Sequence, residues 1–339
     1  MILAFTICSV NYLAQARTLG DSLWQTNPHW TFVIGLVDDL ARANLPAHLL
    51  PAYPLLEVAA LNIPGFANMC ARYDITELNT AVKPFFIEHF FQTPPGPAAN
   101  VPDAVIYFDP DIIVFQPLTH LETALLTNSL VLTPHTLAPT PDWETPNEQQ
   151  HLQTGIFNLG FIGLRHDATA RQFVGWWQER LRYECRLDLC AGLFVDQLWV
   201  NFAPVYYPNV LIETHKGYNV AYWNVHERHL TRRADTWYVT DLNPDVAPTD
   251  GVPLQFFHFS GYGVQQPDHI SKYQTRYTFA QRSDLVPLFQ LYHNRLILND
   301  NDTYRAYPCA YIKPPAVLYY TAARRWLNGP LRRLANRLG

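Results

Sequence analysis

The chain has 339 residues, of which 48% are hydrophobic and 16% charged. This composition excludes a disordered or collagen-like protein, and the length allows one large α/β domain or two small ones. The formal net charge of −5 is distributed unevenly along the chain. The part from Lys313 onward has one Lys, five Arg and no acidic residue. The first 312 residues carry 18 basic and 29 acidic side chains, which gives them a net charge of −11.

The N-terminal segment indicates the start of an α/β protein. Residues 2–9 are apolar and lack a basic start and a cleavage site, which predicts a strand and not a signal peptide. Five scattered cysteines without metal-ligand spacing fit a reducing cytosol, so we expect a cytoplasmic protein. No apolar run is long enough to span a bilayer.

A helix should follow the first strand, because Leu13, Ala16, Leu19 and Leu23 share one face. The next strand, 31–37, ends in Asp38 and Asp39. A strand, a helix and a second strand predict a doubly wound sheet, in which ligands bind beyond the carboxyl ends of the strands. Glycine-rich phosphate fingerprints are missing, which argues against a dinucleotide or P-loop enzyme.

The central feature is the stretch 105–115, an apolar strand interrupted by Asp109-Pro110-Asp111. Two carboxylates so close to buried strands repel each other unless a cation neutralises them. A hard divalent ion, Mn²⁺ or Mg²⁺, suits such a pair. A solvated turn is the alternative.

Three more segments combine polar side chains with apolar surroundings. Lys83 belongs to an otherwise apolar helix and either finds a partner or extends along the surface to water. After a proline-containing loop at 134–153, Asn158 and Gly160 lie in an apolar segment that is either a ligand-facing strand or a bulged one. An amphipathic helix is expected at 167–183. Asp196-Gln197 then precedes an apolar run, where an isolated Asp often caps a helix.

Residues 254–262 predict a last strand that contains His258 and ends at a glycine turn with Gly261. A histidine in an apolar strand is often a core residue hydrogen-bonded to backbone, but the acidic pair upstream favours a metal ligand.

These segments, in this order over residues 1 to about 262, resemble the GT-A glycosyltransferases that use nucleotide sugars, most closely glycosyltransferase family 8. The matching motifs are Asp-Pro-Asp, Lys-Pro-Phe, Phe-Asn-x-Gly, Asp-Gln and His-Phe-x-Gly. The Lys-Pro-Trp that follows the last motif in the family is absent here, so the basic contact to the diphosphate would come from elsewhere, such as Lys272 or Lys216. The resemblance implies a GT-A-like mixed α/β sheet with helices on both faces over 1–312, followed by a basic amphipathic helical tail over 313–339.

The resemblance also implies roles for individual residues. The metal ligands would be Asp109, Asp111 and His258, and the reaction centre Asp196 and Gln197. The donor would be a UDP-sugar. Its uracil and ribose would contact residues at the ends of the first strands, and the rest of the donor would contact a basic residue and the sugar-facing segments. The donor-binding residues would be Thr6, Cys8, Asn11, Tyr12, Asp38, Lys83, Asp109, Asn158, Gly160 and Gly261. For Asp38 a helix-capping role is equally compatible with the sequence.

The implied reaction is the metal-dependent transfer of a hexose with retention of anomeric configuration. The acceptor would be a carbohydrate, a lipid-linked molecule or a protein, and no nucleic-acid partner is expected. A sugar nucleotidyltransferase and a non-catalytic carbohydrate-binding protein are the alternatives. The basic tail predicts either peripheral membrane contact or packing on the enzyme body.

Overall fold

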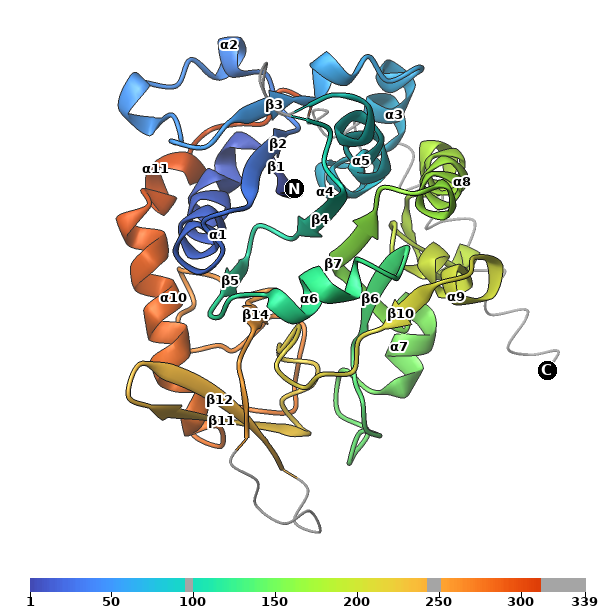
Figure 1. Cartoon of the computed structure of the whole chain (residues 1–339). Helices are drawn as coiled ribbons and strands as arrows, with labels where there is room; N and C mark the ends of the chain where they lie inside the picture. The colour runs from blue at the N-terminus through green and yellow to red at the C-terminus, as the bar shows by residue number, and fades with distance from the viewer. Residues whose placement is uncertain (95–99, 243–250, 312–339) are drawn as a thin grey trace, which may run out of the picture.

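The computed structural model describes residues 1–94, 100–242 and 251–311. Its centre is a seven-stranded sheet in the order β10-β6-β7-β4-β1-β2-β3 (Figure 1). β7 runs antiparallel to β4 and β6, and the other neighbours are parallel. The strands are β1 (Ile2–Cys8), β2 (Thr31–Leu36), β3 (Leu55–Glu57), β4 (Ala104–Phe108), β6 (Leu130–Pro134), β7 (Phe157–Arg165) and β10 (Val210–Ile212).

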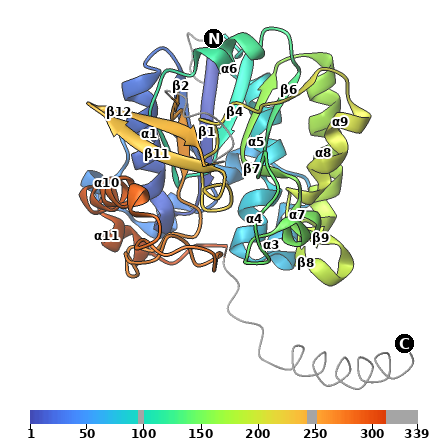
Figure 2. The ribbon, with the colours of Figure 1, turned by 90° about the horizontal axis from the view of Figure 1, so that it is seen from below.

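Alternation along the strands separates two hydrophobic cores. In β1, Leu3, Phe5 and Ile7 belong to one core, whereas Ala4 and Cys8 belong to the other. Figure 2 shows the two layers of helices that cover the two faces. One layer contains α1 (Leu13–Thr26), α2 (Leu40–Ala43), α6 (Thr119–Ala124), α10 (Val286–Leu298) and α11 (Asn301–Arg305). The other contains α3 (Phe66–Arg72), α4 (Ile75–Ala81), α5 (Lys83–Gln92), α8 (Ala168–Glu184) and α9 (Ala203–Tyr206). The predicted α/β class, with a mixed sheet covered on both faces, is confirmed.

Three small sheets complete the fold. The most important pairs β5 (Ile112–Val114) with β14 (Phe256–His258) in antiparallel register, at the carboxyl end of β4. The second contains β11 (Arg228–Arg233), β12 (Thr236–Asp241) and β13 (Val252–Pro253), and the third β8 (Leu187–Asp188) and β9 (Leu193–Phe194).

The structure corrects two details of the predicted elements. The loop expected at 134–153 contains a helix, α7 (Glu148–Thr154), which begins at a capping box in which the Asn147 and Gln150 side chains satisfy each other's backbone N–H groups. The apolar run after Gln197 forms a 3₁₀-helix, η5 (Leu198–Phe202), whose turns are tighter than those of an α-helix. The remaining 3₁₀-helices are η1 (Val10–Tyr12), η2 (Ala47–Leu49), η3 (Val58–Leu61), η4 (Leu189–Ala191) and η6 (Ser283–Leu285).

The basic tail at 313–339 lies outside the described residues, and the domain boundary at 312 stays a prediction. Within the ranges that the structure describes, no helix has the length and apolar character needed to cross a membrane.

Candidate active site

The acidic pair and the distant histidine meet at the end of β4. Asp109 and Asp111 occupy the turn between β4 and β5, and the β5–β14 register sets His258 opposite Ile112. His258 Nε2 lies 3.0 Å from an Asp111 carboxylate oxygen and 3.6 Å from one of Asp109. Within the described residues these three side chains form the one group of three or more potential metal ligands, with ligand atoms all within 4.8 Å of one another. We call them the metal cluster because they could hold a metal ion.

Asn158 orients the His258 ring. Its Oδ1 lies 3.3 Å from His258 Nδ1 and also accepts hydrogen bonds from Gly160 N and Asn219 Nδ2. Because Oδ1 is an acceptor, Nδ1 carries the proton in the neutral ring, and the lone pair of Nε2 faces the two carboxylates. An imidazole held through its second nitrogen in this way is typical of metal-ligating histidines.

The donor set fits a divalent cation. Two carboxylates and one imidazole, close to an open turn, suit Mn²⁺ or Mg²⁺ with remaining positions for water or phosphate oxygens. Burial raises the pKa of Asp109, although Lys83 and His258 oppose the rise and Asp111 adds to it. Burial tends to lower the pKa of His258, but Asp111 and then Asp109 outweigh burial and raise it. A bound cation would offset this repulsion between carboxylates.

Lys83 has a buried partner. The Lys83 ammonium donates to Asp196 at 2.5 Å and to the Leu159 carbonyl at 2.8 Å, and it lies 4.1 Å from the centroid of the Tyr107 ring. Lys83 is 1% exposed, so the surface position considered from the sequence is wrong. Tyr107 in turn donates to Asp109 at 2.5 Å, which connects the Lys83–Asp196 pair to the metal cluster.

Asp196 and Gln197 lie beside this cluster. Burial raises the pKa of the Asp196 carboxyl, and Lys83 opposes that rise. The side chain does not cap η5, whose N-cap residue is Gln197. Gln197 Oε1 accepts from Leu159 N at 3.1 Å and from Asn158 Nδ2 at 3.4 Å, and its Nε2 donates to the Thr154 carbonyl.

The residues expected near the nucleoside separate into two groups. Thr6, Cys8 and Asp38 are 0%, 2% and 1% exposed. The Asp38 carboxylate accepts hydrogen bonds from the backbone N–H groups of Val10, Asp39 and Ala310, which joins β2 to the segment after α11. It does not cap α2, because Asp39 does. Asn11 is half-buried and Tyr12 is exposed, with the Arg305 guanidinium 4.6 Å from its ring centroid.

Gly261 forms the turn after β14 with φ +74°, and an added Cβ would lie 2.4 Å from Ser271 Oγ. Its carbonyl accepts a hydrogen bond from Lys272 N. Lys272 is exposed, whereas the Lys216 ammonium pairs with Asp241. Of the two lysines considered for the diphosphate, Lys272 therefore lies nearer in the fold to the turn that follows His258.

Sequence reasoning missed the residues that support the site. Tyr107 could have been found, because it lies two residues before Asp109, in the buried strand that leads to the acidic pair. His135 and Asn219 had no such signal, since their contacts with Asn158 cross 23 and 61 residues of chain.

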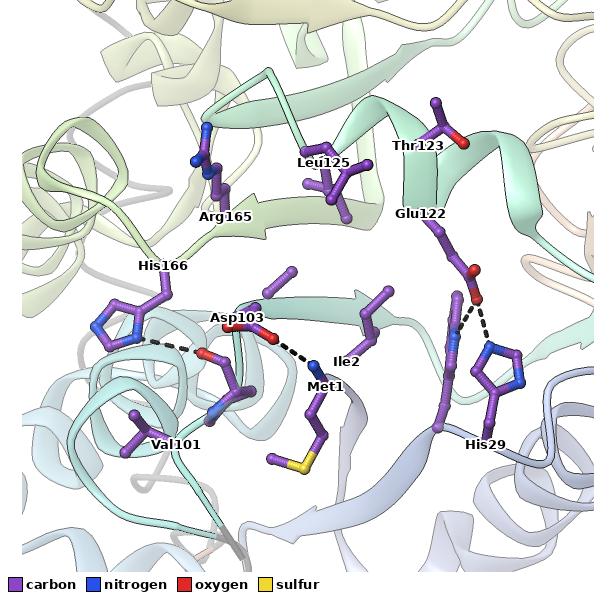
Figure 3. Close-up of a pocket in the computed structure, with 14 residues that line it drawn as sticks. Met1, Ile2, His29, Val101, Asp103, Glu122, Thr123, Leu125, Arg165 and His166 are labelled. Atoms are coloured by element: carbon purple, nitrogen blue, oxygen red, sulfur yellow. Dashed lines mark hydrogen bonds and ion pairs between the residues drawn. The ribbon is translucent and has the colours of Figure 1, made fainter.

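A cavity lies at the end of the sheet opposite to the metal cluster. It has a volume of about 630 Å³ and is lined by residues at the starts of β1 and β4 and the end of β7 (Figure 3). Glu122 accepts hydrogen bonds from both His29 and Trp30 at 2.6 Å, and Asp103 pairs with the Met1 ammonium. Because these carboxylates are occupied and lie away from the carboxyl ends of β1 and β4, the metal cluster remains the candidate active site.

The chain was compared with known proteins by sequence and by structure. No family model matches the chain. It is 27% identical over 292 residues to the uncharacterized protein YfnF of Bacillus subtilis (strain 168), covering 86% of this chain and 90% of YfnF. It is 26% identical over 158 residues to the uncharacterized protein YfnD of the same organism, covering 46% of each.

Similar solved structures include the galactosyltransferase LgtC in complex with donor and acceptor sugar analogs, at 15% identity and a TM-score of 0.46, covering 87% of this chain and 95% of LgtC. The glycosyltransferase GlyE of Streptococcus pneumoniae TIGR4 is similar at 14% identity and a TM-score of 0.44, covering 91% of this chain and 65% of GlyE.

Proposed function

We propose that this protein is a glycosyltransferase that moves a hexose from a UDP-sugar to an acceptor hydroxyl with the help of Mn²⁺ or Mg²⁺. The observation that carries the proposal is the cluster of Asp109, Asp111 and His258 at the carboxyl end of β4. Ligands of doubly wound sheets bind at this end of the strands. A diphosphate supplies the oxygens that complete the coordination of such an ion.

The three ligands would hold the ion where the diphosphate leaves. When bound, the ion acts as a Lewis acid that stabilises the charge developing on the departing UDP. The protein itself keeps His258 in the required tautomer through Asn158 and keeps Asp109 in position through Tyr107. Because protein groups alone make these contacts, they would preorganise the site for the donor.

The donor contacts extend the proposal to the other predicted residues. Asn11 and Tyr12 are the accessible members of the set expected near uracil, and Thr6, Cys8 and Asp38 would support the floor beneath the nucleoside. Lys272, next to the Gly261 turn, would contact the diphosphate. Gly160 allows the His258 ring to approach β7 closely.

Asp196 and Gln197 are the proposed reaction centre. Lys83 pairs with Asp196 and opposes the rise in the Asp196 pKa that burial causes, and Gln197 is fixed by three hydrogen bonds to β7 and α7. Retention of anomeric configuration is part of the proposal. NMR of the product formed from an active donor would measure its anomeric configuration. An inverted product would rule out the roles proposed for Asp196 and Gln197.

Calorimetry of UDP with and without Mn²⁺ tests the proposal. We expect binding that requires the metal and that is lost in Asp111→Asn but kept in Asp268→Asn, a control at an exposed carboxylate. UDP binding that does not depend on the metal, or no UDP binding at all, would contradict the transferase and favour a carbohydrate-binding protein.

Hydrolysis of a panel of UDP-sugars with Mn²⁺ would then identify the donor. Liposome flotation of the chain cut after Ile312 would test membrane contact by the tail.

A further inference from the structure

Tyr12 lies at the same edge of the sheet as the metal cluster. β1 and β4 are parallel neighbours that pair Phe5 with Tyr107, so their carboxyl ends lie side by side. The metal cluster follows β4, and Tyr12 ends η1, the 3₁₀ turn that follows β1. A nucleoside diphosphate bound at this edge can therefore have its phosphates on the metal and its base near Tyr12.

The Arg305 guanidinium covers one face of the Tyr12 ring. Its Cζ lies 4.6 Å from the ring centroid, within the range of a cation–π contact. Tyr12 still has 37% of its surface exposed. Among the described residues the Arg305 side chain forms no hydrogen bond or ion pair, and its Nε is buried. In this part of the chain, the contact with Tyr12 is therefore the one that positions the guanidinium.

Arg305 belongs to a helix with buried anchors. α11 packs against η1. Asn301, at the start of α11, is 1% exposed and accepts a hydrogen bond from Gln15 of α1 at 3.3 Å. Tyr304, which is fully buried, donates to the Leu49 carbonyl. Because these anchors fix α11 on the enzyme body, they also fix the place of Arg305 relative to η1.

A cation on one face of an aromatic ring favours stacking on the other face. The guanidinium restricts the rotation of the Tyr12 ring, so less conformational entropy is lost when a second flat group stacks on it. The positive charge also attracts the carbonyl oxygens that a uracil ring carries. Both effects strengthen the binding of a pyrimidine base, and neither acts on the phosphates at the metal cluster.

We propose that Arg305 is a positioning residue for the nucleobase, which holds the Tyr12 ring so that its uncovered face stacks on the uracil of UDP. The inference rests on the proposed function and deepens it. It gives α11, which lies beyond the segments over residues 1 to about 262 that resemble the GT-A enzymes, a role in donor binding.

Titration calorimetry of the full chain in excess Mn²⁺ tests the inference with two probes, UDP and inorganic pyrophosphate, which lacks the base. Arg305→Gln should weaken UDP binding by about two- to fivefold, the effect of losing a cation–π contact at an accessible site, and should leave pyrophosphate binding unchanged. Arg305→Lys keeps the charge and should retain most of the UDP affinity. Arg295→Gln is the matched control on α10, where Arg295 contacts Gln25, and should change neither affinity.

A double variant separates positioning from direct contact with the donor. Tyr12→Leu removes the ring and should weaken UDP binding further than Arg305→Gln does. Adding Arg305→Gln to Tyr12→Leu should cause no additional loss, because Arg305 acts through the ring. Circular dichroism verifies that each variant folds, and Arg305→Met takes the place of Arg305→Gln if that variant does not.

Three results would overturn the inference: an unchanged UDP affinity without the Arg305 charge, an equal loss of pyrophosphate affinity, or additive losses in the double variant. A wild-type chain that shows no metal-dependent UDP binding would instead overturn the proposed function.

Discussion

At the scale of single residues, the buried pair of Lys83 and Asp196 is the most consequential contact. Both side chains are almost fully buried, with 1% and 3% of their side-chain surface exposed. Removing one partner leaves an uncompensated charge in a low-dielectric interior, which costs more than the intact pair contributes. The pair adjoins Gln197, the next residue along the chain, and Tyr107, whose ring centroid lies 4.1 Å from the Lys83 ammonium.

Lys83→Met should lower the free energy of unfolding by about 3–5 kcal/mol, because Asp196 is then buried without a cation. Without Lys83 the folded-state pKa of Asp196 rises further above its unfolded value, so the folded state binds the proton more tightly. The stability of the variant should then fall as pH rises through and above the ordinary aspartate range. Urea unfolding at several pH values measures both effects.

The double variant Lys83→Met/Asp196→Leu is the control, since it removes both charges and should recover much of the lost stability. A single variant as stable as the wild-type chain would show that the pair has no structural role.

At the scale of elements, β7 and β14 position the histidine that completes the metal cluster. β14 brings His258 to the acidic turn through its pairing with β5, and β7 contacts the ring from the other side. A Cβ on Gly160 would lie 2.3 Å from His258 Cε1, closer than side chains approach one another. Glycine is therefore required at this point of β7 by contact with the imidazole.

Gly160→Ala should displace the His258 ring and weaken Mn²⁺ binding by about tenfold or more, the range seen when a ligand's support is lost. Gly163→Ala is the matched control in the same strand, because its Cβ would lie 3.5 Å from Leu125 and 3.6 Å from Val131, which are ordinary contacts. Mn²⁺ titration followed by electron paramagnetic resonance compares the two. Equal affinities in both variants would contradict the role given to Gly160.

At the scale of the whole molecule, distant parts of the chain close the fold around the carboxyl ends of the strands. Figure 1 shows α10 and α11 beside α1, and α11 contacts η1. Ala310 then donates to Asp38 at 2.7 Å, and Arg17 pairs with Asp300. Binding at this edge of the sheet should therefore stabilise the molecule as a unit.

We expect Mn²⁺ and UDP together, at about 100 times the Kd, to stabilise the folded chain by about 2.7 kcal/mol. This gain should raise Tm by several degrees in differential scanning calorimetry. Asp111→Asn should show no rise with the same additions. A rise of equal size in that variant would mean that the ligands bind away from the metal cluster.

The sequence by itself determined the class of the fold and most of the sheet. Continuous apolar residues before Asp109 identified β4, and the spacing of Leu13, Ala16, Leu19 and Leu23 identified α1, because burial follows the period of each element. The acidic turn was visible for the same reason, since two carboxylates between buried strands break the apolar pattern. The capping residues Asn147 and Gln150 could have predicted the start of α7. They were not recognised because prolines and polar residues dominate the segment in which they lie.

Only the tertiary structure decided what each polar side chain contacts. Asn158 had the chemistry to bind sugar hydroxyls, yet both ends of its amide are engaged by protein groups, among them His258, Gly160 and Gln197. Lys83 had the charge to contact a donor, yet it is paired with Asp196, 113 residues further along the chain. Such partners are set by contacts between distant segments, β7 with His258 of β14 and α5 with the segment before η5. Residue type and local period carry no record of these long-range contacts.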